Sequence, residues 1–287
     1  MQYPHSELVL NNKGQVYHLG VSPEQISDKI ILVGDQDRVG LIAGFFDSTE
    51  HQSQHREFAC TTGNYKGKRI TALSTGIGTD NIDITINELD ALFNIDLEQR
   101  VDYPERTSLD LVRIGTCGIL QPDIPVHAYI LSSYALGLDN VAHFYDIVFS
   151  DDEKRLNEAM MEQLPLPESV ISYVAQSSPE LMLKLSSDQA FEGITVTSSG
   201  FYGPQGRQLR LQNKATNLNK AMTAFRKDGH RITNFEMESS ALFSLGKALG
   251  HSCATICLGI ANRPNTAFSK DHKNHMLGLI EYVLDRI

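Results

Sequence analysis

The sequence predicts an α/β protein with three α/β/α layers, in which helices cover both faces of a central mixed, largely parallel twisted sheet. Two observations predict this fold. Short runs rich in Ile, Val and Leu alternate with amphipathic helical patterns along the 287 residues, and small or polar turn residues follow each run. The hydrophobic share of 41% and the charged share of 21% are those of an ordinary globular chain. Such alternation builds parallel strands that are joined by helices.

Each element is expected from its own pattern. Apolar, β-branched runs predict strands at 30–33, 70–73, 111–114, 129–132, 193–197 and 254–259. Apolar residues at three- and four-residue spacing predict helices at 38–46, 81–93, 153–163, 179–189, 237–249 and 275–284. The chain has no internal repeat, low-complexity tract or glycine–serine linker, so we expect a single domain over residues 1–287.

Two segments look like additions to this framework. Residues 96–110 are polar and charged, and we expect them to form a surface loop that is a candidate contact with a partner subunit. Residues 150–187 are expected to form a helical excursion.

The charge balance limits the partners. A net charge of −10 and a pI near 5.4 exclude nucleic acid as the main partner, because phosphate backbones require clustered Lys and Arg. The N-terminus has no basic start followed by an apolar run, and the longest apolar stretches, such as 253–261, are too short to span a bilayer. We therefore expect a cytoplasmic enzyme without a membrane partner.

Cysteine and histidine spacing argues against disulfide and metal chemistry. The four cysteines form no CxxC pair, so they are expected to be reduced thiols, with Cys253 and Cys257 in a core strand. The pairs His51/His55 and His272/His275 lack the glutamate or further ligands of a known motif. No metal site is expected.

The first motif with chemical potential is LVGDQDRVGLIAGFF at 32–46. The expected strand ends at Gly34 and Asp35, and a helix is expected to begin near Arg38. Backbone N–H groups of this turn and the Arg38 guanidinium should therefore lie close together. This arrangement predicts an anion site. A simple tight strand-to-helix turn is an equal alternative.

A second candidate anion site lies in LVRIGTCGIL at 111–120. Arg113 in the middle of a buried strand is unfavourable unless an anion pairs with it, and Thr116 adds a hydroxyl. The alternative is an internal salt bridge to a carboxylate such as Glu238.

The loop SGFYGPQGRQLRL at 199–211 concentrates groups that suit a heterocyclic base. Phe201 and Tyr202 offer aromatic faces, Gln205 both donates and accepts, and Arg207 brings a guanidinium. A surface loop with incidental polar residues is the alternative.

Glu236 and Glu238 flank Met237 at the expected start of a helix. Helix capping accounts for one acid. Because two residues span about 200° of helix rotation, the two carboxylates are not expected to face the same side. The inward one is a candidate for binding sugar hydroxyls.

Seven motifs together resemble the nucleoside phosphorylase superfamily, and most closely its uridine phosphorylases. They are GDQDRV, HREF, STGIG, RIGTCG, GFYGPQGR, FEMES and ANR, in the family's order and approximate spacing from about His18 to Arg263. Seven modest motifs in the right order are a specific signature. The resemblance implies a pentosyltransferase that transfers the sugar of a nucleoside, here uridine, to inorganic phosphate.

The resemblance also implies which residues bind phosphate. Gly34, Arg38, Arg113 and Thr116 match the family's phosphate site, and Arg56 matches an arginine that reaches into the neighbouring subunit's site. A homo-oligomer with shared sites is therefore expected.

For the nucleoside, the resemblance implies that an aromatic residue and a Gln/Arg pair bind the base. It further implies that the ribose is held by a methionine, a glutamate and a histidine from the neighbouring subunit. Glu236 would then serve the helix start or a contact behind the site. The matching residues are Phe201, Gln205 and Arg207 for the base, and His18, Met237 and Glu238 for the ribose, with Arg113, Thr116, Arg207 and Glu238 as the catalytic residues.

Three positions depart from the family or refine the expectation. Residues 259–266 lack the aspartate by which purine-cleaving relatives protonate the base, which favours a pyrimidine, and Arg263 is expected to position Arg207. Cys117 stands where the uridine phosphorylases carry threonine. Asn81 replaces a serine that, with a glutamate matching Glu57, contributes to a monovalent-cation site, so a cation near Glu57 stays open and no other cofactor is expected.

Three alternatives remain at this point: a purine nucleoside phosphorylase, a nucleosidase that uses water, and a nucleoside-binding protein without turnover. A nucleosidase has no need of Arg38, Arg56 and Arg113 together, so loss of Arg113 would separate the first two enzyme classes.

Overall fold

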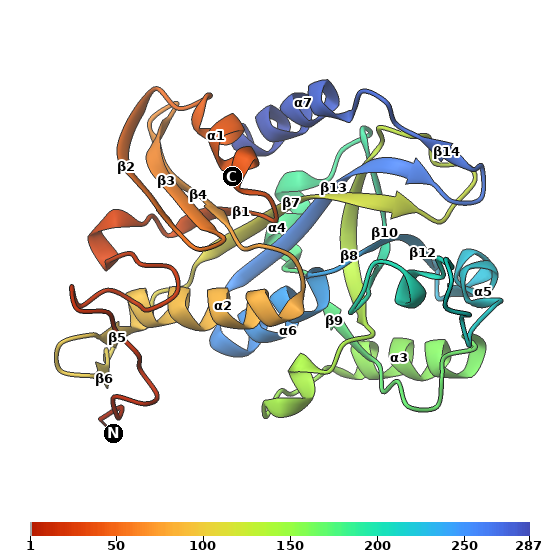
Figure 1. Cartoon of the computed structure of the whole chain (residues 1–287), viewed down its shortest axis with the longest axis horizontal. Coiled ribbons are helices and arrows are strands. Elements are labelled where there is room, and N and C mark those ends of the chain that lie inside the picture. Colours follow the sequence, from red (N-terminus) through yellow and green to blue (C-terminus); the bar gives the residue numbers. More distant parts are fainter. Residues whose placement is uncertain (1) are drawn as a thin grey trace.

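The computed structural model describes residues 2–287, which form one twelve-stranded mixed sheet with helices on both faces (Figure 1). The strand order is β11 (Arg226–Lys227), β12 (His230–Glu236), β10 (Ala190–Thr197), β8 (Tyr129–Gly137), β13 (Ser252–Asn262), β7 (Asp110–Ile119), β1 (Lys29–Val33), β4 (Lys68–Ser74), β3 (Phe58–Tyr65) and β2 (Ser48–His55). Two short strands extend it, β14 (Ala267–Phe268) beside β13 and β9 (Tyr173–Gln176) beside β8.

The centre of the sheet is parallel. β1 pairs in parallel with β4 and β7, and β7 with β13, while β8, β10 and β12 form a second parallel group. The two groups meet antiparallel, where β13 pairs with β8. A further antiparallel pairing of β12 with β7 curls this half of the sheet onto itself.

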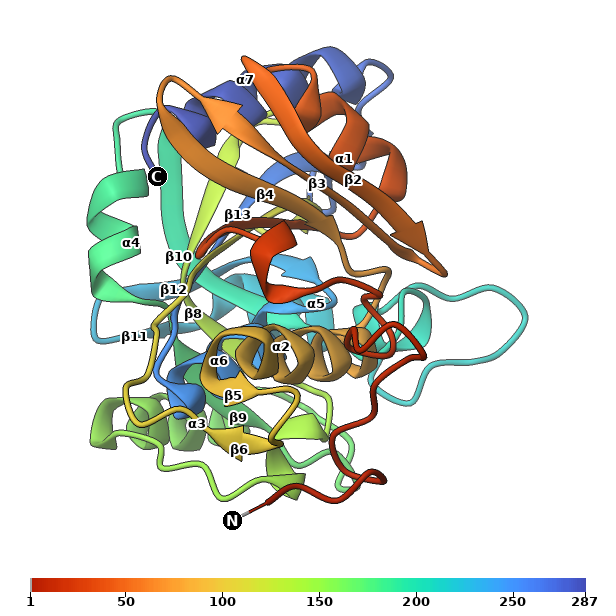
Figure 2. The same ribbon diagram turned by 90° about the vertical axis from the view of Figure 1, so that its left-hand side faces the viewer.

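Helices cover the two faces because successive strand residues point to opposite sides. Along β1, Ile30 and Leu32 pack in the same core as α2 (Thr79–Asn94) and α6 (Ser239–Leu249). Ile31 and Val33 pack in the other core, with α1 (Gln36–Ala43), α4 (Pro179–Leu185) and α7 (His272–Leu284). Figure 2 shows the sheet between these two sets of helices. The predicted three-layer α/β fold is confirmed.

Two further helices and three short 3₁₀ turns lie outside these layers. α3 (Asp151–Gln163) packs against β9, and α5 (Leu218–Ala224) contacts β12. The 3₁₀ turns are η1 (Pro23–Gln25), η2 (Val141–Phe144) and η3 (Gly203–Gln205). Every helix among residues 2–287 is too short or too polar to cross a lipid bilayer.

Several expected boundaries shift. α1 begins two residues early and ends at Ala43, α4 ends at Leu185 rather than at 189, and the strand expected at 111–114 continues to Ile119. The hairpin of β2 and β3 was not expected, because β2 is an exposed edge strand of polar residues with no hydrophobic alternation. Cys253 and Cys257 lie buried on β13, as predicted.

Residues 102–108 are exposed, as expected of a surface loop, but the start of this segment also contains structure that was not expected. Strands β5 (Ile95–Asp96) and β6 (Val101–Asp102) form a small separate hairpin. The buried Arg100 at its tip donates from Nε to the Tyr3 carbonyl (2.9 Å) and from Nη2 to the Pro4 carbonyl (3.1 Å). The segment therefore anchors the N-terminal residues of its own chain, because a buried guanidinium needs acceptors for its N–H groups.

Candidate active site

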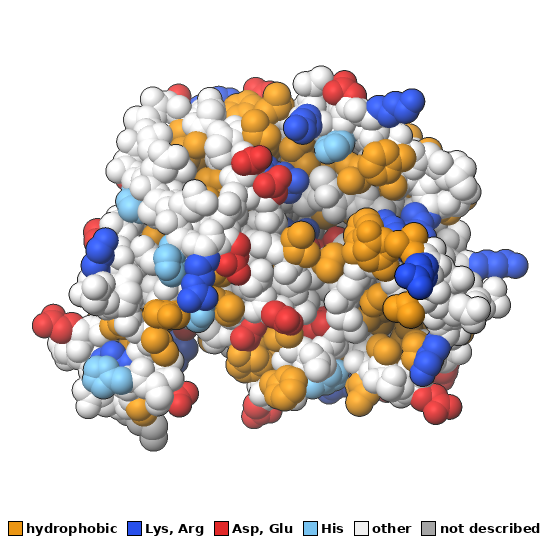
Figure 3. Space-filling view, viewed as in Figure 1, with side chains coloured by type: hydrophobic (Ala, Val, Ile, Leu, Met, Phe, Trp, Pro, Cys, Tyr) orange, Lys and Arg blue, Asp and Glu red, His pale blue; other side chains and the backbone are white. Residues whose placement is uncertain are grey.

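A cavity of about 450 Å³ opens where the carboxyl ends of β1 and β4 meet β7, β12 and β13. Figure 3 shows apolar side chains gathered around a hollow near β14 on the face of Figure 1. Nine of the eleven predicted site residues line the cavity: Gly34, Arg38, Arg113, Thr116, Phe201, Gln205, Arg207, Met237 and Glu238. The structure thus brings together motifs that are spread over 205 residues of sequence, from 34 to 238.

One end of the cavity is cationic. Asp35 caps α1 by accepting the Asp37 N–H (3.0 Å), which fixes the first helical turn and with it Arg38. The Arg38 Nη1 donates to the Ile114 carbonyl (3.2 Å). Burial and the nearby Arg113 both lower the pKa of Arg38, so an anion at this end would relieve the repulsion.

Gly34 allows the backbone to approach closely at this end. A Cβ at this position would lie 3.3 Å from the Gly76 carbonyl, which is tighter than ordinary van der Waals contact. The turn after β1 can therefore present its N–H groups to a ligand at the start of α1.

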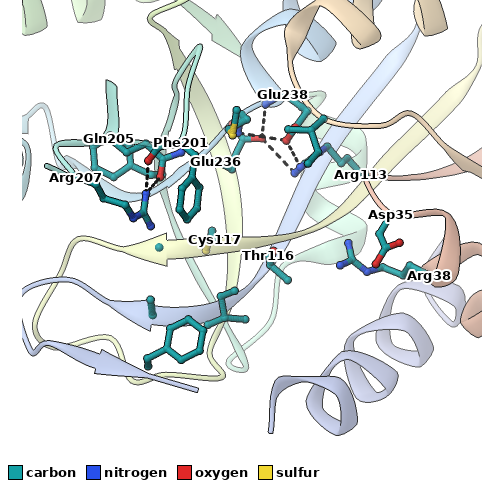
Figure 4. Close-up of a pocket in the computed structure, with 18 residues that line it drawn as sticks. Asp35, Arg38, Arg113, Thr116, Cys117, Phe201, Gln205, Arg207, Glu236 and Glu238 are labelled. Atoms are coloured by element: carbon teal, nitrogen blue, oxygen red, sulfur yellow. Dashed lines mark hydrogen bonds and ion pairs between the residues drawn. The ribbon is translucent and has the colours of Figure 1, made fainter. Parts of the chain in front are cut away.

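Arg113 lies buried between two carboxylates. Its Nη1 is 3.2 Å from Glu236 Oε2, and its Nη2 donates to Glu238 Oε2 (Figure 4). Burial alone would lower the pKa of Arg113, but Glu238 and Glu236 raise it above its ordinary value. The alternative of an internal salt bridge to Glu238 is thus confirmed, and Glu236 is a second partner.

The prediction that Glu236 and Glu238 face different sides is wrong. Glu236 is the last residue of β12 and α6 begins at Ser239, so no helical turn separates the two carboxylates, and each residue is only 3% exposed. Because β12 pairs antiparallel with β7, the residues that follow Phe235 lie beside the part of β7 that contains Arg113.

The two glutamates nevertheless differ in their remaining contacts. Glu236 Oε2 accepts the backbone N–H groups of Glu238 and Ser239, both at 2.9 Å, which confirms the expected role of one acid at the helix start. Glu238 Oε1 accepts the Gly78 N–H (2.8 Å) from the glycine-rich turn after β4. Burial raises the pKa of Glu238, and the charge of Arg113 opposes that shift.

The opposite end of the cavity holds the base-reading candidates. The Arg207 guanidinium lies 3.7 Å from the centroid of the Phe201 ring, and its Nη1 donates to the Phe201 carbonyl (2.7 Å) and to Gln205 Oε1. Gln205 is only 3% exposed. Figure 4 shows these contacts at the cavity, while Tyr202 of the same loop is 55% exposed and does not line it.

Two arginines lie close together at this end. Both side chains approach Gly118: a Cβ atom added to this glycine would lie 4.0 Å from Arg207 Nη2 and 4.0 Å from Arg263 Cγ. Burial and the charge of Arg263 lower the pKa of Arg207 to about 10. Burial lowers the pKa of Arg263 as well. The paired positive charges favour a ligand that carries or develops negative charge here.

The structure does not bring His18 and Arg56 into this cavity. His18 Nδ1 contacts Glu88 Oε1 (2.6 Å), and the exposed Arg56 lies over the Tyr17 ring at 5.4 Å. The two segments touch, since His55 Nδ1 is 2.8 Å from the His18 carbonyl. Their expected roles in a neighbouring subunit's site stay predictions.

Sequence reasoning missed part of the lining. Phe235, Gly118 and Phe268 line or border the cavity from β12, β7 and the two-residue β14. Phe235 is the first residue of the FEMES motif and Gly118 is the last of RIGTCG, so their positions were available as a signal. Phe268 carries none, because its neighbours are a short polar turn.

Comparison with known protein families gives a direct match. The model of the phosphorylase superfamily matches residues 28–286. A uridine phosphorylase of Thermococcus kodakarensis is 26% identical over 265 residues, covering 90% of this chain and 81% of the relative. A DeoD-type purine nucleoside phosphorylase of Oceanobacillus iheyensis is also 26% identical, over 240 residues, with 83% and 84% coverage.

Solved structures agree with these relatives. A Trypanosoma brucei nucleoside phosphorylase, described as showing uridine phosphorylase activity, superposes with a TM-score of 0.89 at 28% identity and covers 98% of this chain and 99% of its own. A uridine phosphorylase from Vibrio fischeri shares the fold at a TM-score of 0.69 and 21% identity. The resemblance seen in the seven motifs is confirmed, and the chain belongs to the phosphorylase superfamily.

Proposed function

We propose that the protein catalyses the reversible phosphorolysis of uridine to uracil and ribose 1-phosphate. The observation that carries the proposal is one cavity with an arginine-lined anion end and a Gln205/Arg207 base end, and with Glu238 between them. A phosphate oxygen forms the new bond to the anomeric carbon, the bond from that carbon to N1 breaks, and its electron pair leaves on uracil.

At the anion end, Arg38, Arg113, Thr116 and the backbone at Gly34 are proposed to hold phosphate. Arg113 already has two carboxylate neighbours, which offset part of its positive charge. Arg38 has no salt-bridge partner among residues 2–287. A second free arginine would stabilise phosphate further, which fits the proposed contribution of Arg56 from another subunit of a homo-oligomer.

Between the two ends, Glu238 is proposed to accept hydrogen bonds from the 2′- and 3′-hydroxyls of ribose. Arg113 and the Gly78 N–H favour the carboxylate form, which is the better acceptor. Met237 would pack against the sugar, and His18 of the neighbouring subunit would reach the 5′-hydroxyl.

At the base end, Gln205 and Arg207 are proposed to bind the uracil edge while Phe201 packs on the ring. Uracil leaves with negative charge, and the unneutralised pair Arg207 and Arg263 would stabilise that charge as it develops. The turn 259–266 offers no aspartate to protonate a purine. This absence favours a pyrimidine over a purine substrate.

The test is uridine consumption by the purified protein with and without inorganic phosphate, with inosine alongside and the sugar product identified. Phosphate-dependent release of uracil and ribose 1-phosphate, with inosine untouched, is the expected result. Turnover of inosine would identify a purine nucleoside phosphorylase, and uracil release without phosphate a nucleosidase. Uridine binding without any turnover would contradict an enzymatic role. The same assay with and without potassium tests whether a monovalent cation near Glu57 contributes, a question that the sequence leaves open.

A further inference from the structure

One carboxylate on α2 holds the loop that carries His18. Glu88 Oε2 accepts the Leu19 N–H (2.8 Å), and the His18 N–H lies 2.9 Å from Glu88 Oε1 and 3.0 Å from Oε2. Glu88 Oε1 also lies 2.6 Å from His18 Nδ1. Two backbone N–H groups and one side chain of the loop therefore converge on a single carboxylate, whose side chain is only 16% exposed.

The contact with Glu88 determines which ring nitrogen of His18 carries the proton. A carboxylate has only acceptor sites, so His18 Nδ1 must be the donor. In the neutral imidazole, Nε2 is then an acceptor that is left for another partner. The His18 side chain is 31% exposed, so a second molecule can reach it.

The same loop is also held by contacts that do not involve Glu88. His55 Nδ1 lies 2.8 Å from the His18 carbonyl, and Arg56 Nη2 donates to the Tyr17 hydroxyl (3.5 Å). His18 and Arg56, the two residues proposed to reach a neighbouring subunit, thus lie on one preformed surface. Because these contacts are independent of the carboxylate, a change of Glu88 should alter the His18 ring more than the path of the loop.

We infer that Glu88 is a positioning residue for the proposed reaction. It fixes His18 with Nε2 as a hydrogen-bond acceptor and so favours nucleosides whose 5′-hydroxyl can donate to this atom. The inference rests on the proposed function, in which His18 reaches the 5′-hydroxyl of a nucleoside in the neighbouring subunit. Without the carboxylate, the ring is free to rotate and to carry its proton on Nε2, which then no longer accepts.

The kinetic test compares uridine with 5′-deoxyuridine, which lacks the hydroxyl but keeps the base and the other ribose groups. Wild-type kcat/KM is expected to be about tenfold higher for uridine, as on loss of one hydrogen bond. Glu88→Gln should lower this ratio to about two, because the new amide N–H faces His18 Nδ1 and favours the other tautomer. The value for 5′-deoxyuridine should change less than about twofold. Glu158→Gln removes the same charge from an exposed position on α3 and should leave the ratio unchanged.

A double variant shows whether Glu88 acts through His18. His18→Ala should lower the ratio as Glu88→Gln does, and the combination of both should have no further effect. Equal losses for both nucleosides in Glu88→Gln, or a further loss in the double variant, would mean that Glu88 only stabilises the loop and would overturn the inference. Wild-type protein that turns over neither nucleoside would contradict the proposed function itself, whereas a ratio that is the same in wild type and Glu88→Gln would contradict the inference alone.

Ring ¹⁵N spectra of histidine-labelled protein give a second readout, which does not depend on turnover. The His18 signals are identified by their loss in His18→Ala. At alkaline pH, where the ring is neutral, they should show a protonated Nδ1 and a bare Nε2 in the wild type and move toward the opposite tautomer in Glu88→Gln. A wild-type ring that carries its proton on Nε2 would overturn the inference.

Discussion

Arg113 on β7 and Glu238 at the start of α6 form a buried ion pair between residues 125 positions apart in the sequence. The pair ties the anion end of the cavity to the proposed ribose contact. It exists because β12 turns back along β7 and delivers its last residues to the arginine.

Replacement of Arg113 by alanine is expected to abolish phosphorolysis and to destabilise the fold. The substitution leaves Glu236 and Glu238 buried without their cation, and such a loss typically costs about 3–5 kcal/mol. Activity should fall at least about a hundredfold, as on removal of one donor at a reacting centre. Chemical denaturation and initial rates at saturating uridine measure the two effects.

The control for Arg113→Ala is Arg231→Ala, which breaks the more exposed ion pair with Asp123 (2.8 Å). That change should cost less than about 1 kcal/mol and leave activity intact. Equal stability losses in the two variants would show that the buried pair is not the stabilising unit we describe.

Arg207 is expected to act on the leaving base. Its guanidinium lies against Phe201 at the end of the cavity where uracil is proposed to bind. Arg207→Ala should lower kcat for uridine by about 10²–10³. The loss should be smaller for 5-fluorouridine, because its more acidic base needs less stabilisation.

Comparison of the two substrates also separates this role from simple binding. A substitution that only loosened the base would raise KM equally for both substrates and leave the ratio of their kcat values unchanged. That result would remove Arg207 from the chemical step.

Gly206 is expected to hold the base-reading loop in place. It adopts a left-handed φ of 69°, and a Cβ would stand 2.7 Å from the Asn219 side chain. Gly206→Ala should therefore displace Gln205 and Arg207 and raise KM for uridine. Gly229→Ala is the matched control, since φ is 81° and no atom lies within 4 Å of its Cβ position.

Both glycine variants should lose about 1–2 kcal/mol from the left-handed backbone alone. Only Gly206→Ala should change KM. An unchanged KM in Gly206→Ala would mean that the loop adapts without moving the base-reading pair.

Local pattern predicted the central elements well. α2 and α6 were found because their apolar residues repeat every three or four positions, and β1 because it is a continuous β-branched run. Strands β2 and β12 were not predicted. β2 is a polar edge strand without hydrophobic alternation. β12 is followed directly by a helix pattern, and Glu236, the last residue of the strand, appeared to belong to the start of that helix.

The site shows the same division. Gly34, Arg113 and Gln205 were identified by motif, because backbone turns and buried charges leave a trace in the sequence. The sequence did not predict that Glu236 and Glu238 both contact Arg113. This contact depends on the antiparallel pairing of β12 with β7, strands that lie more than a hundred residues apart. Non-local pairing of this kind has no signature in a single segment.

The stability of the protein should fall in acid through Glu153. This buried side chain accepts the Lys247 Nζ (2.8 Å) and the N–H groups of Ser150 (2.6 Å) and Gln176 (2.8 Å). Burial alone would raise the pKa of Glu153, but these contacts lower it below its ordinary value. Because the folded-state pKa is depressed, the stabilisation is fully present above the ordinary carboxyl pKa and is lost as pH falls through the folded value.

Glu153→Gln should therefore lower the free energy of unfolding at pH 7 by about 1.5–3 kcal/mol, the usual contribution of hydrogen bonds to a charged group. The difference from wild type should shrink steadily below about pH 4.5, where the wild-type carboxylate itself begins to protonate in the unfolded chain. Glu180→Gln, at an exposed helix pair with Lys184, should change stability by less than about 0.5 kcal/mol at either pH. Urea unfolding at pH 7 and pH 3.5 measures all three proteins. A difference between wild type and Glu153→Gln that stays constant between these pH values would show that Glu153 stabilises the fold through packing rather than through its charge.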